Sequence, residues 1–475
     1  MWKSFLFLAF FFISITTEAG PKEFYYQRAV QRLASTLNKD FFPFLQAQLP
    51  QVLEVEAVAE IFVQKLDHFN ARDRQTFQQR YYVNSNYASG ANAPVLFYIC
   101  GESSCTSAIF AGAIQTHAKN LGAHMVALEH RYYGKSQPFA NYETPNLRYL
   151  SMPQALADLA EFQQYAVKKF ALHGKWISMG GSYPGMLAAF YRLKYPQLNT
   201  GALASSAPVR VENNFEKYDY HSAKVLGAEC LARVQTVVRH AEELFDKPAE
   251  LLAFKRLFEA EALVDSVDFL YFLADYGPAI ATQFGKHVIF CSSLASSQNV
   301  VDGYVKFIKH IYMSWGMNAL SMSFQAAKET SIPSNELFGM RPWFYQSCTE
   351  FGFWQTAYHD PRFSARSTKI NEEFHRHVCK VLFNLGTLAD TKKVNEMFYD
   401  QLIAGSAEQI LFTNGSNDPW SELSITPDMN TRHPSYMIQN GAHCDDLSAP
   451  SNSDSVSLKK SRDLFFSGAK AWLKN

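Results

Sequence analysis

The sequence contains only one long apolar run, and it lies near the beginning. Residues from Phe5 to Ile15 are almost all apolar, and no second long stretch of this kind occurs among the 475 residues. The run is too short to span a bilayer, which takes about 20 residues. A basic Lys3 before it and small residues at Thr17 and Ala19 after it are typical of a signal peptide over residues 1–19, the alternative being a membrane anchor. We therefore expect a mature protein of the secretory pathway, secreted or lysosomal, that is not bound to a membrane.

The sequence also lacks an excess of charge of either sign. Its 44 lysines and arginines balance 44 aspartates and glutamates. Proteins that bind nucleic acids present a basic surface, so this balance gives no indication of a nucleic-acid partner. The chain has no internal repeat and no low-complexity block, while 47% of its residues are hydrophobic and 39 are phenylalanine. Such a composition predicts a large folded core rather than disorder.

Cysteine is sparse, and its spacing does not fit a metal site. None of the seven cysteines forms a C-x-x-C pair with matching histidines, so we expect no zinc. In a secreted chain an odd number of cysteines indicates disulfides and one unpaired thiol, for which we favour Cys444. Cys100 and Cys105 are close enough in sequence for a local disulfide. The other four, which could join parts of an insertion, are Cys230, Cys291, Cys348 and Cys379.

Strand-like and helical stretches alternate over residues 57–210. The strand-like runs are Glu60 to Leu66, Gln79 to Val83, Val95 to Cys100, Met125 to Glu129, Lys175 to Met179 and Gly201 to Ser205. Helical apolar spacing separates them, most clearly from Pro153 to Phe170, with further helices expected near Ile109 to Asn120 and from Met186 to Lys194. This alternation predicts an α/β domain with a mainly parallel sheet that is covered by helices on both faces.

The character of the sequence changes at about residue 211. Helical stretches such as Ala223 to Phe245 dominate residues 211–333, and strand signals are sparse, so we interpret this part as a helical insertion. Strand-like runs return at Gln409 to Thr413 and at Ser435 to Gln439, and a terminal helix is expected near Leu458 to Leu473. Residues 57–210 and 334–475 would then form one α/β domain, preceded by an N-terminal arm over residues 20–56.

A candidate nucleophile lies between a predicted strand and a predicted helix. Ser182 stands in the segment Gly180-Gly181-Ser182-Tyr183-Pro184-Gly185. In α/β-hydrolases the nucleophilic serine occupies such a strand-to-helix turn, where small neighbours permit a strained backbone. The usual G-x-S-x-G spacing is absent, because Pro184 takes the last position and glycine follows one residue later. Taken alone, the segment fits either a nucleophile turn or a glycine-rich turn without chemistry.

An acid and a histidine follow in the order that this fold requires. Asp418 comes after the strand-like run that ends at Thr413, and His443 comes after the run that ends at Gln439. They are 25 residues apart (443 − 418), which suits loops after neighbouring strands. A serine hydroxyl is a weak nucleophile until a base takes its proton. We therefore predict a triad of Ser182 as nucleophile, His443 as base and Asp418 as the acid that orients it, a chemistry that needs no cofactor.

The same chemistry needs two backbone N–H groups that face the negative charge on the substrate oxygen. One is expected from Tyr183, the residue after the nucleophile. For the other we favour the loop of Gly101 and Glu102, which follows the strand-like run from Val95 to Cys100. The Glu102 side chain could instead bind a substrate terminus or cap the next helix.

Several other polar residues have a simpler structural interpretation. The segment from His130 to Gly134 is expected to form a buried hydrogen-bonded network rather than to act in catalysis. Asp67 and His68 are interpreted as structural. Asn414 begins the only N-x-S/T acceptor in the chain, but it adjoins Asp418, so we expect no glycan there. Three further residues are interpreted as surface histidines, namely His359, His375 and His377.

Taken together, these segments resemble those of a known family of serine peptidases, the one that includes lysosomal Pro-X carboxypeptidase, lysosomal dipeptidyl peptidase and thymus-specific serine protease. The resemblance is strongest to the last of these. The matching segments lie between residues 60 and 447 and are Gln64 to Phe69, Leu128 to Gly134 with Ser136, Gly180 to Gly185, Ala204 to Val209, Tyr345 to Gly352, Asn414 to Trp420 and Gly441 to Cys444. The S-Y-x-G spacing around Ser182 is the form found in this family.

The resemblance implies an α/β-hydrolase fold in which a helical insertion caps the active site. It carries the triad onto Ser182, Asp418 and His443. It also implies two disulfides, Cys230 with Cys291 and Cys348 with Cys379.

One residue departs from the family pattern. Cys100 stands where the family usually has glycine, directly before the loop of Gly101 and Glu102. A disulfide between Cys100 and Cys105 would reshape this loop. The geometry of the second N–H donor at Gly101 and any role of Glu102 at a substrate terminus therefore depend on that disulfide.

The sequence thus predicts a serine-type peptidase that cleaves short peptides through an acyl-enzyme. The resemblance adds an exopeptidase preference for bonds after proline, of either the carboxypeptidase or the dipeptidyl-peptidase type. Two alternatives stay open, a catalytically silent peptide-binding protein on the same fold and an esterase. The oligomeric state stays open as well, a homodimer included.

Overall fold

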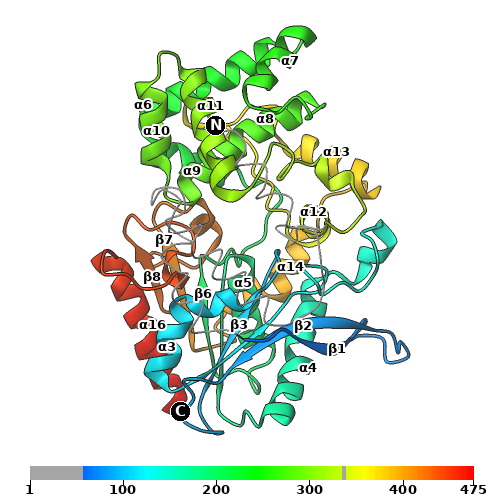
Figure 1. The fold of residues 1–475 in the computed structure, drawn as a ribbon, viewed down its shortest axis with the longest axis vertical. Helices are drawn as coiled ribbons and strands as arrows, with labels where there is room; N and C mark the ends of the chain where they lie inside the picture. Colours follow the sequence, from blue (N-terminus) through cyan, green and yellow to red (C-terminus); the bar gives the residue numbers. More distant parts are fainter. Residues whose placement is uncertain (1–56, 334–338, 475) are drawn as a thin grey trace, which may run out of the picture. The chain divides into compact units, whose positions relative to one another are not determined.

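The structure is a computed structural model that describes residues 57–333 and 339–474 (Figure 1). These residues belong to one compact unit, Val55–Asn475. The predicted signal peptide over residues 1–19 and the predicted arm over residues 20–56 lie outside the described residues. The first described element is a strand that begins at Glu60.

A single eight-stranded sheet organises the described residues, with the strand order β1-β2-β4-β3-β5-β6-β7-β8. The strands are β1 (Glu60–Lys65), β2 (Thr76–Asn84), β3 (Val95–Ile99), β4 (His124–Leu128), β5 (Trp176–Gly181), β6 (Gly201–Ser205), β7 (Ile410–Gly415) and β8 (Ser435–Ile438). β1 and β2 are antiparallel to each other, and β2 is antiparallel to β4, whereas β3 to β8 run parallel. This is the α/β-hydrolase fold, and the prediction of a mainly parallel sheet is confirmed.

Helices cover the sheet, and its central strands are buried. All five residues of β4 and all five of β6 are buried, as parallel strands covered on both faces require. Phe97 of β3 packs edge-on against Tyr191 of α5 (Tyr183–Lys194) and next to Phe162 of α4 (Met152–Phe170). The helices α3 (Ala113–Leu121) and α16 (Val456–Lys474) lie together in Figure 1, joined by the rings of His117 and Phe465 at 4.7 Å.

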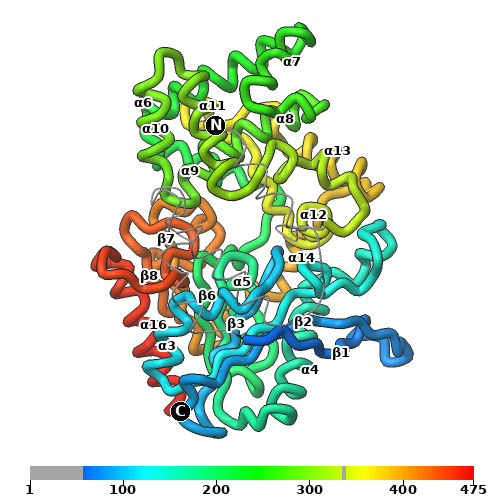
Figure 2. Tube along the Cα trace, viewed as in Figure 1, coloured from blue at the N-terminus to red at the C-terminus, as the bar shows by residue number. Residues whose placement is uncertain are grey.

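The chain leaves the sheet after β6 and returns to it at β7 (Figure 2). The first part of this excursion is a group that we call the cap helices, α6 (Glu216–Glu243), α7 (Pro248–Leu257), α8 (Ser266–Ala274), α9 (Ile280–Gln283), α10 (His287–Ser296) and α11 (Val300–Trp315). They share a hydrophobic core of their own, to which Ala365 and Ile370 also contribute. The cap core therefore draws on residues beyond the predicted insertion of residues 211–333.

Four further α-helices follow in the described part of this excursion, α12 (Met340–Gln346), α13 (Glu372–Phe383), α14 (Thr391–Met397) and α15 (Tyr399–Ile403). Another hydrophobic cluster joins Phe344 of α12 and Leu382 of α13 to Tyr132 and Tyr133, which follow β4. Three disulfides are formed, Cys100 with Cys105, Cys230 with Cys291 and Cys348 with Cys379, and Cys444 is a free thiol.

One of the three predicted surface histidines is buried. His375 is 1% exposed and stacks on Trp354 with ring centroids 4.6 Å apart, whereas His359 and His377 are exposed. The prediction was wrong for His375 because α13 is amphipathic, and His375 occupies the same face as Val378, Cys379 and Leu382. Burial lowers the pKa of His375 to about 3, so the ring is neutral in the folded protein.

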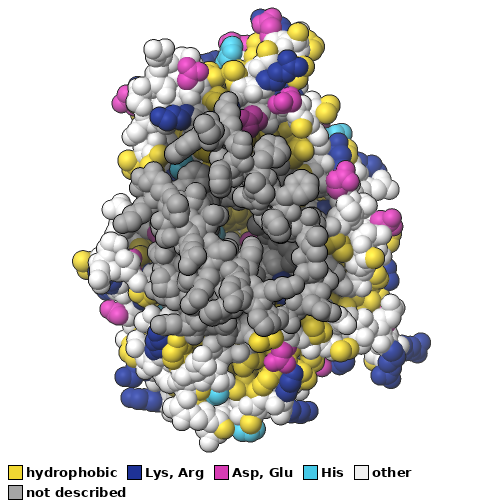
Figure 3. Space-filling model, viewed as in Figure 1, with side chains coloured by type: hydrophobic (Ala, Val, Ile, Leu, Met, Phe, Trp, Pro, Cys, Tyr) yellow, Lys and Arg dark blue, Asp and Glu magenta, His cyan; other side chains and the backbone are white. Residues whose placement is uncertain are grey.

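The surface agrees with the balanced composition. Figure 3 shows lysine and arginine side chains interspersed with aspartate and glutamate on the described part of the visible face. Asn414 is fully buried, and its side-chain amide donates to the carbonyl of Ile425 at 3.0 Å, so a glycan has no access to it. Within residues 57–333 and 339–474, no helix has the length and apolarity needed to cross a membrane.

Candidate active site

Ser182 occupies a strained turn between β5 and α5. Its backbone has φ 63° and ψ −134°, a conformation that costs a residue with a side chain on the order of 1–3 kcal/mol. The Ser182 N–H donates to the carbonyl of Ser205 at 2.9 Å, which holds the turn against the end of β6. A Cβ atom on Gly180 would lie 2.5 Å from the Pro184 oxygen, and one on Gly185 would lie 2.8 Å from the Ser205 oxygen. These close approaches explain why glycine stands at both positions.

Asp418 and His443 form a buried pair. Asp418 is fully buried at the start of the short helix Pro419–Leu423, where its Oδ1 accepts the Trp420 N–H at 3.1 Å. Its Oδ2 accepts the Nδ1–H of His443 at 2.8 Å. Because this bond places the proton on Nδ1, the free Nε2 of a neutral ring is an acceptor, as a general base requires. Burial lowers the pKa of His443, but the Asp418 carboxylate and the Cys444 thiol outweigh it, and the pKa is raised well above its usual value.

The loop that carries His443 is tied to the ends of β6 and β7. The Cys444 N–H donates to the Ser206 hydroxyl at 3.0 Å. The buried Asp446 carboxylate accepts the Ser205 hydroxyl at 2.5 Å and the Thr413 hydroxyl at 2.7 Å. Cys444 also lies against the nucleophile turn, because a Cβ atom on Gly181 would be 2.6 Å from its Sγ. These contacts keep the His443 loop beside the turn of Ser182.

The three predicted triad residues therefore lie at the same edge of the sheet. Ser182 follows β5, Asp418 follows β7 and His443 follows β8, and these strands are parallel. The hydrogen bonds of the described residues join His443 to Asp418 but do not include one from the Ser182 hydroxyl to His443. Such contacts are often loose in enzymes without substrate.

The segments that carry the predicted oxyanion donors pack against each other. Tyr183 is the first residue of α5, so its N–H has no partner within the helix. Gly101 packs directly on Pro184, since a Cβ atom there would lie 2.3 Å from the Pro184 Cγ. Burial raises the pKa of Glu102, against smaller opposing effects of a backbone hydrogen bond and of His443. Glu102 does not cap the next helix, whose N-terminal flanking residue is Thr106.

Of the cap helices, α9 contacts the predicted triad directly, and α6 contacts Gln283 and Trp420 beside it. The carbonyl of Gln283, the last residue of α9, accepts the His443 N–H at 2.8 Å, and the next residue, Phe284, packs edge-on against the His443 ring. The Gln283 side chain accepts the Trp420 indole N–H at 3.0 Å and the Tyr218 hydroxyl of α6 at 2.7 Å. The cap helices thus contact both the loop of Asp418, which we call the acid loop, and the loop of His443. No sequence motif indicated these particular contacts.

A second cap contact reaches the acid loop. His221 of α6 lies 2.9 Å from a Glu422 carboxylate oxygen through Nδ1 and 3.1 Å from the Ser416 carbonyl through Nε2. Both partners are acceptors, so only a protonated ring donates to both at once.

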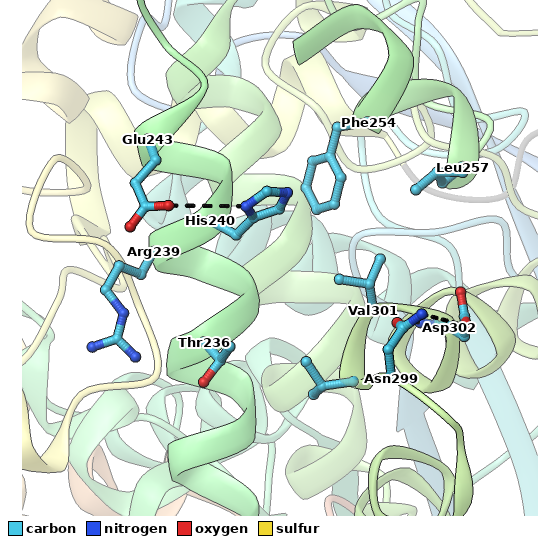
Figure 4. A pocket seen from close by; sticks show the side chains of 10 residues that line it. Thr236, Arg239, His240, Glu243, Phe254, Leu257, Asn299, Val301 and Asp302 are labelled. Carbon is cyan, nitrogen blue, oxygen red and sulfur yellow. Dashed lines mark hydrogen bonds and ion pairs between the residues drawn. The ribbon is translucent and has the colours of Figure 1, made fainter. Parts of the chain in front are cut away.

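A pocket of about 490 Å³ lies within the cap helices, away from these residues. Figure 4 shows its lining, which includes Thr236 and Arg239 of α6, Phe254 of α7 and Val301 of α11. None of the predicted triad or oxyanion residues lines it. The sheet edge with Ser182, Asp418 and His443 is therefore the candidate active site.

Within the described part of the chain, no group of three or more His, Cys, Asp or Glu side chains could hold a metal ion.

Comparison with known proteins identifies the family. The sequence pattern of Serine carboxypeptidase S28 matches residues 64–465, which is most of the chain. The chain belongs to this family. It is 36% identical over 405 residues to the protein named "Probable serine protease EDA2" of Arabidopsis thaliana, with 81% of this chain and 80% of that protein covered.

Two further relatives of this S28 protein support the assignment. It is 32% identical to the thymus-specific serine protease of Mus musculus, with 87% of each chain covered. It is 29% identical to the lysosomal Pro-X carboxypeptidase of Bos taurus, with 86% of this chain and 87% of that protein covered. The S28 protein is thus a serine peptidase, and the family predicted from its motifs is confirmed.

Proposed function

We propose that this S28 protein is an exopeptidase that cleaves short peptides after proline through a Ser182 acyl-enzyme. The observation that carries the proposal is the buried hydrogen bond between Asp418 and His443, at the same sheet edge as the strained turn of Ser182. This is the arrangement of an acid, a base and a nucleophile in serine peptidases.

The reaction follows from these positions. Rotation of the Ser182 side chain brings its hydroxyl to the Nε2 of His443, which takes the proton as the oxygen attacks the peptide carbonyl. The N–H groups of Tyr183 and Gly101 stabilise the negative charge on the carbonyl oxygen. His443 then gives its proton to the leaving amine, and a water molecule that His443 activates hydrolyses the ester at Ser182. Asp418 stays ionised and stabilises the imidazolium throughout.

Two observations support an exopeptidase. The cap helices α6 and α9 lie against the loops of Asp418 and His443, which favours short peptides over folded proteins as substrates. A relative of similar length is named lysosomal Pro-X carboxypeptidase, which supports a preference for bonds after proline. A carboxypeptidase must hold the C-terminus of its substrate, whereas a dipeptidyl peptidase must hold the N-terminus. We propose Glu102 as a residue that contacts the terminus that this enzyme holds.

We also propose that the protein acts in the secretory pathway, either secreted or in lysosomes. Its three disulfides suit an oxidising compartment, and one relative is named as lysosomal. The apolar run at Phe5 to Ile15 would act as the signal peptide that directs the chain there.

The experiment compares the mature chain with its Ser182→Ala variant. Both are treated with a fluorophosphonate probe and with proline-containing peptides whose N-terminus or C-terminus is blocked, and mass spectrometry identifies the products. We expect labelling of the wild type alone, and trimming that stops when one particular terminus is blocked. Peptide binding without turnover or labelling would favour the silent binding protein, and turnover of acyl esters alone would favour the esterase.

A further inference from the structure

Tyr183 is held from behind by a chain of buried side chains that the reaction itself does not use. Its hydroxyl lies 2.9 Å from the Nε2 of His130 and 3.0 Å from the Nε2 of Gln346. The Oε1 of Gln346 accepts the hydroxyl of Tyr133 at 2.7 Å. All four side chains are at most 5% exposed. Gln346 ends α12, more than 160 residues after Tyr183, so only the tertiary structure joins them.

The donor and the acceptor of each hydrogen bond in this row of side chains can be assigned. The Nδ1 of His130 lies 2.7 Å from the Arg131 carbonyl, which is only an acceptor, so Nδ1 carries the ring proton. The Nε2 of a neutral ring then accepts the Tyr183 hydroxyl, whose oxygen accepts the Gln346 N–H. Burial lowers the pKa of His130 to about 4, which keeps the ring in this neutral form. A buried chain in which every group has its partner holds its members in one orientation.

Tyr133, at the far end of these hydrogen-bonded side chains, reaches the loop of Gly101, the second oxyanion donor. The ring of Tyr133 packs on Gly339, where a Cβ atom would lie 2.7 Å from the ring. The Gly339 N–H donates to the Glu102 carbonyl at 3.2 Å. Gly101 in turn packs on Pro184, the residue after Tyr183. The chain therefore supports both oxyanion donors.

We infer that His130, Gln346 and Tyr133 are positioning residues for the oxyanion hole, which hold the Tyr183 N–H and the loop of Gly101 in the geometry of the transition state. The inference rests on the proposed roles of Tyr183 and Gly101 in the peptidase reaction. Such residues act through other groups and do not touch the substrate. Their loss should affect the reacting state and leave the binding of substrate in its ground state unchanged.

The test removes single hydroxyl groups from these hydrogen-bonded side chains. Tyr183→Phe deletes the central hydroxyl, and Tyr133→Phe deletes the distal one while keeping the ring on Gly339. Removal of a whole oxyanion donor costs about 100- to 1000-fold in kcat, and displacement of a donor costs less. We therefore expect kcat to fall about 10- to 100-fold in Tyr183→Phe, and less in Tyr133→Phe, with KM unchanged.

The control is Tyr191→Phe. Tyr191 lies on the same helix α5, is fully buried, and donates its hydroxyl to the Oε1 of Gln163 at 2.6 Å, so it matches the deletion without touching the chain. We expect this variant to lose a comparable amount of thermal stability but to keep its kcat. The double variant Tyr183→Phe with Tyr133→Phe should be no slower than Tyr183→Phe alone, because both changes break one chain.

Two binding measurements separate positioning from general destabilisation. A peptide boronate forms a tetrahedral adduct with the serine and occupies the oxyanion hole, so its Ki should rise by the same factor as kcat falls. In a Ser182→Ala background, Tyr183→Phe should leave the Kd of the uncleaved peptide unchanged. A rise in KM or in this Kd would overturn the inference, and so would a kcat equal to that of Tyr191→Phe. A wild-type chain that is neither labelled nor active would instead refute the proposed function itself.

Discussion

Replacement of Asp418 by asparagine gives the most direct test of the proposed base. Asp418 accepts two hydrogen bonds in a fully buried site, from the Trp420 N–H at Oδ1 and from His443 Nδ1 at Oδ2. An asparagine that keeps its oxygen toward Trp420 presents its NH2 group to His443. The ring must then accept at Nδ1 and carry its proton on Nε2, and in this tautomer it cannot take the proton of Ser182.

The size of the loss can be divided between two causes. Turning the amide around restores the tautomer but sets its NH2 group against the Trp420 N–H, which leaves a buried donor unpaired at a cost of about 1–3 kcal/mol. That corresponds to about 5- to 150-fold, whereas an Asp→Asn change in such a triad lowers kcat by about 10⁴-fold, or about 5.5 kcal/mol. We therefore expect a loss of about 10⁴-fold in which the larger part comes from the missing negative charge beside the imidazolium.

The assay is kcat for a proline-containing peptide as a function of pH. Burial alone lowers the pKa of His443, and the Asp418 carboxylate is the leading cause that raises it, so its removal should lower that pKa. Because the neutral ring is the active form, the acid limb of the wild-type profile should move to lower pH in Asp418→Asn. The matched control is Asp390→Asn, since Asp390 also caps a helix, through the Lys393 N–H at 3.2 Å, and asparagine caps equally well. A variant that keeps kcat within tenfold of the wild type, or an acid limb that moves to higher pH, would refute this reasoning.

Three further predictions concern the support of the site and the buried titratable groups. Gly181→Ala places a methyl group 2.6 Å from the Cys444 Sγ and should lower kcat by at least about tenfold, with partial recovery when Cys444→Ala is added, as steady-state kinetics would reveal. Burial raises the pKa of Glu350 to about 8 from 4.5, so stability should fall as the pH rises through this window, and Glu350→Gln should melt with a flatter pH dependence there. Burial lowers the pKa of His375 from 6.5 to about 3, so its contribution is present above pH 6.5 and is lost as the pH falls toward 3; melting temperatures of His375→Gln should decline less across that range.

The fold was predictable from the sequence because local residue patterns indicate its strands and helices. Buried parallel strands such as β4 and β6 are mostly apolar runs, and helices such as α4 have regular apolar spacing. The candidate residues Ser182, Asp418 and His443 could be located for the same reason, since each follows a recognisable strand. Parallel strands bring such loops to one edge of the sheet.

The support of the site was decided by contacts between segments that are distant in sequence. Nothing local in α9 marks the carbonyl of Gln283 as the partner of His443, and nothing local in α12 directs Gln346 to Tyr183. His375 was assigned to the surface because its side chain is polar. It is buried because it lies on the apolar face of α13. Sequence periodicity determines which face of an element is apolar, but how the helices pack on one another determines which polar groups meet. The sequence by itself therefore determined the sheet, the order of the candidate residues and the family, whereas only the tertiary structure decided what holds Asp418, His443 and Tyr183 in place.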